Sequence, residues 1–197
     1  IGTQDTFAIA AHEGWHQYTQ TTFAGRLPQW LEEGCATYCE GFRWSTIEPG
    51  RAVFAAWSNV ERFDRLRDAH RAGTLMSLRT LLSAEPAVLL AGSTNATLDY
   101  YAQLWALMHF LREGAEGRYR SGLIQALQDA SAGRLKRTRI GAMQQRVTGA
   151  RSFGERVFQT YMSDNFAMAN AEYQAFIERV VAPGSKQLIV AGQSPVR

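Results

Sequence analysis

The sequence predicts a mainly α-helical domain, and three observations support this fold class. Apolar residues recur at spacings of three and four along most of the chain, which is the period of a helix with one buried face. Glycine and proline residues fall between these segments, where helices end. Only one short segment near the end of the sequence has the composition of a β-strand.

Seven helices are expected, taken in order along the chain. They cover residues 7–18, 30–38, 52–66, 98–111, 123–127, 153–162 and 173–181. Gly25 and Pro28 separate the first two helices, and Pro49 and Gly50 precede the third. Residues 85–97, which contain a proline and many small polar residues, are expected to form a mobile loop. Residues 186–190, with three aliphatic side chains in a row, are expected to form a strand.

Composition restricts the class of protein. The 197 residues fit a single domain, and an apolar content of 46% predicts a folded core and excludes a disordered chain. The apolar runs at residues 87–91 and 105–111 are shorter than the roughly 20 residues that cross a bilayer, so no membrane span is expected. Cys35 and Cys39, four residues apart in an expected helix, are expected to be reduced.

The formal net charge of +3 is small, with 21 basic and 18 acidic residues. Two arginine-rich runs, at residues 62–71 and 134–139, are interleaved with leucine or aspartate as in a solvated helix. We therefore expect no nucleic-acid partner. The competing interpretation, a helical domain that grips nucleic acid through residues 134–139, requires binding that weakens steeply with salt.

The segment with the clearest chemistry is His12-Glu13-Gly14-Trp15-His16. Two histidines four residues apart on a helix lie on one face about one turn apart, so both imidazoles can reach one zinc ion. Glu13 then lies beside the metal, where its carboxylate can accept a proton from a bound water. This is the HExxH arrangement of a zinc hydrolase. A pair of structural histidines on an amphipathic helix is the alternative.

A catalytic zinc ion usually has three protein ligands and keeps one position for water. The next expected helix offers Glu32 and Glu33, and the 16 residues between His16 and Glu33 allow a turn at Gly25 and a return alongside the first helix. The two glutamates differ in direction by about 100°, so only one of them is expected at the metal. A solvated pair of glutamates is the alternative.

These motifs resemble those of the gluzincin metallopeptidases. In that family HExxH is followed, after a spacer, by a helix with the pattern W-L-x-E-G-x-A-x-Y, which matches Trp30 to Tyr38 here. The sequence is most similar to the peptidase-MA-like bacterial domains of uncharacterised function. The resemblance implies a zincin-like fold in which His12, His16 and Glu33 bind zinc, Glu13 is the general base, and Glu32 is an outward-facing neighbour.

A later segment, residues 100–111, is similar to a gluzincin helix that begins with a tyrosine near the zinc. The resemblance implies that Tyr101 hydrogen-bonds the oxyanion of the transition state. The lysine and glycine that follow this tyrosine in the aminopeptidase branch are replaced by Gln103 and Leu104. A core or rim aromatic is the alternative for Tyr101. His109, within the apolar run, is expected to be a core histidine.

The expected organisation is one gluzincin-like domain over residues 1–197. The zinc-site helices occupy residues 1–48, a helical C-terminal part residues 49–182, and a tail residues 183–197. Gluzincins place a small β-sheet before the HExxH helix, but only eleven residues precede His12. We therefore expect that sheet to be largely absent from this chain, which would be a fragment of a longer bacterial protein, exported if an upstream signal was removed.

The sequence thus predicts a zinc-dependent peptidase acting on a peptide or protein substrate. In this hypothesis the zinc-bound water attacks a peptide carbonyl after Glu13 takes its proton. Asp99 and Glu40 are candidates for the groups that orient His12 and His16 from behind. The alternative is a non-catalytic peptidase-like binding module, either zinc-stabilised or metal-free. The oligomeric state is not predicted.

Overall fold

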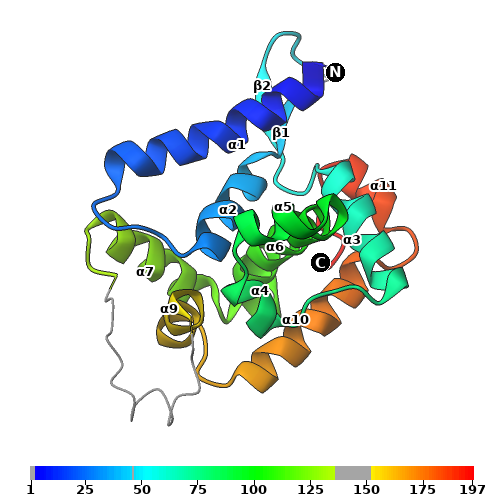
Figure 1. Cartoon of the computed structure of the whole chain (residues 1–197). Helices are drawn as coiled ribbons and strands as arrows, with labels where there is room; N and C mark the ends of the chain where they lie inside the picture. The colour runs from blue at the N-terminus through cyan, green and yellow to red at the C-terminus, as the bar shows by residue number, and fades with distance from the viewer. Residues whose placement is uncertain (1–2, 46, 136–151) are drawn as a thin grey trace, which may run out of the picture.

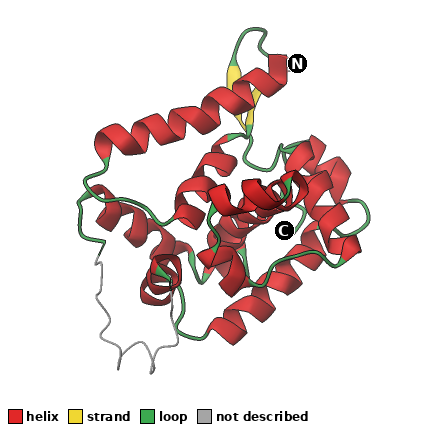
Figure 2. Ribbon diagram, in the orientation of Figure 1, coloured by secondary structure: helices red, strands yellow, loops and turns green. Residues whose placement is uncertain are grey.

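Helices make up most of the computed structural model, which describes residues 3–45, 47–135 and 152–197 (Figure 1). Within these ranges, strands are confined to one small hairpin near the first helix (Figure 2). The described helices are α1 (Thr3–Thr22), α2 (Gln29–Cys39), α3 (Val60–Ala72), α4 (Leu78–Ser83), α5 (Pro86–Gly92), α6 (Thr94–Glu113), α7 (Arg120–Ser131), α9 (Phe153–Tyr161), α10 (Phe166–Val180) and α11 (Ser185–Val190), with the short 3₁₀ helix η1 (Ala115–Gly117) after α6. The expected mainly α fold is confirmed.

Helix α6 forms the centre of the molecule. Every residue from 102 to 111 is buried, as expected for a helix that is apolar on all sides. Helices α2, α3, α5, α7 and α10 all pack against it (Figure 1). Apart from Ala36 and Ala69, the buried hydrophobic residues that the structure describes belong to one core that extends from Leu27 to Val196. This core is the rigid support on which α2 and its acidic residues are placed.

Helix α2 lies unusually close to α6 at Gly34. A Cβ atom on this glycine would lie only 3.0 Å from Cγ and Sδ of Met108 on α6. Trp30, fully buried at the start of α2, donates a hydrogen bond from Nε1 to the carbonyl oxygen of Gly154 at 3.1 Å, which ties α2 to α9. Helix α2 is therefore fixed from two sides, and the position of Glu33 next to Gly34 is fixed with it.

Helix α1 crosses the outside of this core, next to α2 (Figure 1). Its outer face carries exposed apolar residues, including Ile9 and Tyr18. At its C-terminal end, backbone amides of Ala24 and Gly25 donate to carbonyl oxygens of Ser131 and Ala130, both at 3.1 Å, which attaches the α1–α2 connection to the end of α7. The inner face of α1 is thus turned toward α2.

The hairpin pairs β1 (Phe42–Trp44) with β2 (Ala52–Phe54) in antiparallel register, with Phe42 opposite Phe54. The Phe7 ring of α1 packs edge-on against Trp44 at 4.7 Å between ring centroids. The predicted helix at 52–66 is therefore wrong in its first half. Helix α3 begins only after Asn59, whose side-chain oxygen accepts a hydrogen bond from the Arg62 amide and caps the helix.

Two further expectations from the sequence are wrong. Residues 186–190 lie in helix α11, not in a strand. The one sheet among the described residues is the β1–β2 hairpin, and a helix bonds its own backbone without a partner strand. Residues 85–97 are not a loop but contain α5 and the start of α6. Ser93 between them caps α6 by accepting a hydrogen bond from the Ala96 amide.

The arginine-rich run at 62–71 lies in α3 and is largely neutralised within the fold. Arg62 bonds Glu40, Arg65 bonds Asp99 at 2.6 Å, and Arg67 bonds two aspartates of its own helix. The second run, at 134–139, lies outside the described residues from position 136 onward. The helices described are all too short or too polar to pass through a bilayer.

Candidate metal centre

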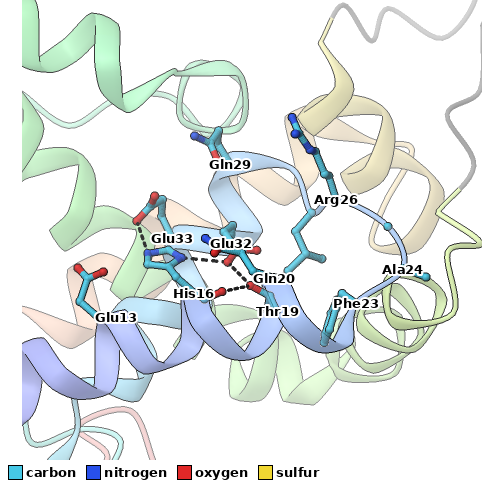
Figure 3. A pocket seen from close by; sticks show the side chains of 12 residues that line it. Glu13, His16, Thr19, Gln20, Phe23, Ala24, Arg26, Gln29, Glu32 and Glu33 are labelled. Carbon is cyan, nitrogen blue, oxygen red and sulfur yellow. Dashed lines mark hydrogen bonds and ion pairs between the residues drawn. The ribbon is translucent and has the colours of Figure 1, made fainter.

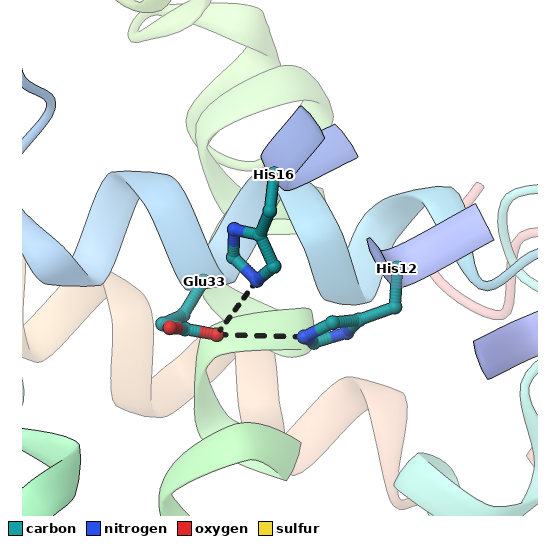
Figure 4. A group of neighbouring side chains, drawn as sticks. All are labelled: His12, His16 and Glu33. Atoms are coloured by element: carbon teal, nitrogen blue, oxygen red, sulfur yellow. Dashed lines mark ion pairs between the residues drawn. The ribbon is translucent and has the colours of Figure 1, made fainter. Parts of the chain in front are cut away.

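Helices α1 and α2 bring His12, His16 and Glu33 together (Figure 4). The Nε2 atoms of His12 and His16 lie 3.5 and 3.6 Å from the same oxygen, Oε2 of Glu33. One ligand atom from each residue lies within 4.8 Å of the other two. The spacing of four residues places both imidazoles on the inner face of α1, as expected from the sequence, and α2 presents Glu33 opposite them.

The Oε2 atom of Glu33 is buried and, among the described residues, has no hydrogen-bond donor. Its distances to the two imidazole nitrogens exceed the usual range for an N–H···O hydrogen bond. A buried carboxylate oxygen without a partner is rare, because its desolvation is not compensated. Tetrahedral zinc with bonds of about 2.0–2.1 Å separates its ligand atoms by about 3.3–3.4 Å, close to the distances found here. The three side chains therefore fit a metal ion.

Glu40 holds His12 from behind. Its Oε1 lies 2.8 Å from Nδ1 of His12, and it also accepts hydrogen bonds from Asn59 and, at both oxygens, from Arg62. Burial opposes the charged form of Glu40, but these donors outweigh burial and lower its pKa. Because an ionised carboxylate only accepts, Nδ1 of His12 carries a proton, and in the neutral imidazole that ligation requires, Nε2 is the nitrogen left free for a metal ion.

Glu32 holds His16 in the same way (Figure 3). Its Oε1 lies 3.0 Å from Nδ1 of His16 and accepts a hydrogen bond of 2.7 Å from Oγ1 of Thr19. The expected outward-facing Glu32 is therefore wrong, whereas only Glu33 of the two glutamates belongs to the group of side chains that could hold a metal ion. Helices α1 and α2 are close enough that Glu33 lies at Nε2 of His16 while Glu32 lies at Nδ1.

Of the two orienting groups that the sequence suggested, Glu40 is in place and Asp99 is not. Asp99 bonds Arg65 through Oδ1 at 2.6 Å and Thr74 through Oδ2 at 3.3 Å, on the side of α6 that faces α3. The sequence did not single out Thr19 or Arg62 for this site. The spacing between His16 and Thr19, one further turn along α1, is the only sequence signal that could have pointed to Thr19.

The charges around the histidines favour a divalent cation. The carboxylates of Glu32, Glu33 and Glu40 and the guanidinium of Arg62 leave a formal excess of two negative charges. Burial disfavours the charged imidazole of His12, but Glu33 and Glu40 outweigh this and raise its pKa to about 9. In the metal-free protein, the extra proton on His12 therefore offsets part of the negative charge that a bound cation would otherwise neutralise.

Two cavities are each lined in part by Glu13, which is exposed on α1 and lies beside His16 (Figure 3). One cavity, of about 620 Å³, lies toward the C-terminal end of α1 and is bordered by His16, Glu33, Phe23 and Arg26. The other, of about 350 Å³, lies toward the N-terminal end and is lined by residues that include His12, Arg62 and Tyr101. Glu13 lines both cavities, so a ligand that fills them passes this carboxylate.

Tyr101 of α6 lies at the edge of the second cavity. Its ring centroid is 6.1 Å from that of His12, and the Arg62 guanidinium carbon lies 5.4 Å from its ring centroid. Burial and the neighbouring carboxylate of Glu33 raise the pKa of Tyr101, so its phenol stays protonated and can donate a hydrogen bond. Tyr101 is therefore near the candidate metal ligand His12, whereas Tyr100 beside it is fully buried.

His109 is a core residue, as expected. Its side chain is buried and stacks on Trp57 with ring centroids 3.6 Å apart. Its Nδ1 lies 3.6 Å from Glu113, and burial lowers its pKa. His109 is not part of the cluster formed by His12, His16 and Glu33, the one group of metal-binding geometry found among the described residues.

A comparison with protein-family models finds one family, described as "Protein of unknown function (DUF1570)", which matches residues 6–135. The match covers about two thirds of the chain and includes α1, α2, α3 and α6, which supply the site. No curated protein and no solved structure matches the chain.

Proposed function

The chain belongs to the DUF1570 family, and from the geometry of its site we propose that it is a zinc-dependent peptidase. One observation carries the proposal: two imidazole nitrogens face one buried carboxylate oxygen that lacks a hydrogen-bond donor, at separations that suit tetrahedral zinc. We also propose that α1 and α2 correspond to the two metal-binding helices of a zincin-like fold. Three protein ligands would leave one position for water, as in catalytic zinc sites.

When bound, zinc would supply a water whose pKa is lowered to about 7 and would polarise a substrate carbonyl. His12, His16 and Glu33 would hold the ion, and Glu40 and Glu32 would keep the two imidazoles in the orientation that ligation needs. Glu13 would accept the proton of the water and pass it to the departing amine. Tyr101 would donate its hydroxyl proton in a hydrogen bond to the oxygen that becomes negative in the transition state.

The two cavities support an extended substrate. Because they lie on either side of Glu13 along α1, a peptide passing from one to the other would place a bond beside the base. Both cavities are within the size range of about 300–1,000 Å³ that is usual for ligand pockets. A peptide or protein substrate is therefore the class that we propose.

Metal analysis and a peptide library test the proposal. The protein purified without chelator is expected to contain about one zinc ion per chain, and Glu13→Gln is expected to keep the ion while peptide cleavage falls by about a thousandfold or more. His16→Ala serves as the matched variant, since it should lose both metal and cleavage.

The outcomes separate two classes of protein. Cleavage that depends on Glu13 supports the peptidase. If the protein instead holds stoichiometric zinc but shows no cleavage that depends on Glu13, it is a zinc-stabilised binding module. Metal-free protein, with no zinc taken up on addition of the ion, would reject the metal centre itself.

A further inference from the structure

A third cavity, of about 540 Å³, lies on the other face of α2 from Glu33. Cys35 and Cys39 of α2 line it, and around the helix axis they point to roughly the opposite side from Glu33. Trp15 of α1, Met108 of α6 and three apolar residues of α7 also line it. Trp15 follows Glu13 by two residues and so turns to the opposite flank of α1. The cavity is therefore separate from the candidate metal centre.

The cavity has one apolar end and one cationic end. Four of its residues, Tyr38, Arg112, Arg120 and Arg197, also line a neighbouring cavity on the side of Glu113, so they stand together at the boundary between the two. The apolar residues do not border that neighbour and lie away from the boundary: Trp15, Met108, Leu123, Ile124 and Leu127. Three guanidinium groups therefore stand at one end of a pocket that is otherwise lined by aliphatic, aromatic and sulfur-containing side chains.

The cationic end has more positive than negative charge. Arg197 pairs with Glu113 at 2.8 Å. Arg112 donates to the hydroxyl oxygen of Tyr38, and Arg120 donates from Nε to the backbone oxygen of Arg112 at 2.8 Å. Within the described residues, Arg112 and Arg120 form no ion pair with a carboxylate. Both guanidinium groups line this end of the cavity, and an anion bound there would accept hydrogen bonds from charged donors.

At the apolar end, the indole nitrogen of Trp15 is buried and, among the described residues, has no hydrogen-bond acceptor. Ile124 is 48% exposed although it borders an apolar cavity. Ile124 therefore belongs to a surface that a ligand would cover, since an exposed aliphatic side chain gains by being removed from water.

We propose that this cavity binds a single-chain amphipathic anion, with its hydrocarbon chain against Trp15, Ile124 and the α7 leucines and its charged head on Arg112 and Arg120. A carboxylate or a phosphate head fits the same guanidinium pair, because both accept paired N–H donors. The chain length is limited by the cavity, whose volume lies within the usual range for small-molecule sites. The site needs neither the metal nor Glu13.

Calorimetric titration of the whole chain with dodecanoate and with dodecyl phosphate, both below their micellar concentrations, tests this site. One molecule of at least one anion should bind per chain, and the tighter of the two identifies the preferred head group. Dodecanol, which has the same chain without the charge, should bind at least tenfold more weakly, and butyrate, which has the charge without the chain, should not bind measurably.

Two kinds of variant locate the binding. The exposed double variant Arg112→Gln/Arg120→Gln should weaken binding tenfold or more, and Ile124→Glu should abolish it by placing a charge in the apolar end. Because all three positions are exposed, these variants should fold as the parent does. Arg118→Gln, an exposed arginine nearby that pairs with Glu172 outside the cavity, should leave the affinity unchanged.

Several results would overturn the site. Absence of binding by both anions is one, and dodecanol that binds as tightly as dodecanoate is another. An anion could also bind a metal ion through its head group, so the titration is repeated with Glu33→Gln. Binding that Glu33→Gln removes, while Arg112→Gln/Arg120→Gln retains it, would assign the anion to the metal centre instead. Binding that survives Glu33→Gln supports the separate site even if no peptide is ever cleaved.

Discussion

The Nδ1 atom of His12 lies 2.8 Å from Oε1 of Glu40, a buried carboxylate that also binds the Arg62 guanidinium through both of its oxygens. One carboxylate thus links the first expected metal ligand to helix α3. His16 has an equivalent partner in Glu32, which Thr19 supports. Both imidazoles are therefore held from behind before any ion binds.

This support predicts that Glu40→Gln and Glu32→Gln each weaken zinc binding by about 10–100-fold. An amide can present its NH₂ group to the imidazole in place of an acceptor, which disturbs the tautomer that ligation needs. Thr19→Val should have a smaller effect in the same direction. Competition with a chromogenic chelator measures the affinities, and Glu48→Gln, an exposed glutamate on the hairpin turn, is the control. Unchanged affinity in both glutamine variants would show that the carboxylates do not orient the ligands.

The raised pKa of His12, about 9, predicts how metal binding depends on pH. Between pH 6.5 and 9 the metal-free imidazole is protonated, so zinc must displace a proton, and its affinity should fall as the pH is lowered from 9. Calorimetry in buffers of different ionisation enthalpy would count the protons released. His12→Ala should remove this pH dependence along with most of the affinity.

The same pKa gives an opposite trend for the stability of the metal-free protein. A folded-state pKa above 6.5, the ordinary value for histidine, means that the charged imidazole favours folding. This contribution is complete below pH 6.5 and is lost as the pH rises through about 9. Urea unfolding of chelator-treated protein at several pH values should show this loss, and Glu40→Gln should reduce it. A flat profile over this range would contradict the raised pKa.

Tyr101→Phe is expected to lower kcat by about 10²-fold or more if the phenol stabilises the oxyanion, with little change in KM or zinc content. The position of Tyr101 beside His12 and at the edge of the cavity motivates this expectation. Steady-state kinetics on the best library peptide provide the measurement, and Tyr18→Phe on the exposed face of α1 is the matched control. A loss of zinc in Tyr101→Phe would indicate a structural role instead.

Substitutions of two glycines, Gly14 and Gly154, are expected to change the stability of the protein in opposite directions. Gly14 lies inside α1 with open space where a Cβ would be, so Gly14→Ala should stabilise the protein by up to about 1 kcal/mol. At Gly154 a Cβ would lie 2.0 Å from the Leu82 carbonyl oxygen, so Gly154→Ala should destabilise it by about 1–3 kcal/mol. Urea unfolding with chelator present compares the two variants. Equal stabilities would contradict the close contact of α9 with α4.

The sequence predicted the long helices because each carries a sustained apolar face, as α1, α2, α6 and α10 do. It did not predict α4, α5 or the hairpin, whose few residues are too short to show a period. Residues 186–190 were assigned to a strand because Leu188, Ile189 and Val190 favour one locally. Packing of α11 against α3, with Ile189 fully buried, decides the structure there, and such a contact between distant segments leaves no local signal.

At the candidate site, the sequence identified the residues whose spacing alone brings them together. His12 and His16 share a face because a helix has 3.6 residues per turn. Glu33 required the resemblance to a family pattern, because geometry alone allowed Glu32 as well. The role of Glu32 behind His16 and of Arg62 behind Glu40 depends on how closely α1, α2 and α3 pack, which one sequence does not encode in any local pattern.

Helix α1 contributes the two histidines of the cluster, whereas Glu33 and the two carboxylates that orient the histidines, Glu32 and Glu40, all come from α2 and its C-cap. An ion bound by the cluster would therefore link α1, a peripheral helix, to α2 and the core of the molecule. Chelation should loosen α1 selectively, with faster hydrogen exchange along its inner face and earlier protease cleavage in the connection to α2, while α6 remains protected. The lifetime of the bound ion would then be set by how often α1 detaches rather than by the strength of any one bond.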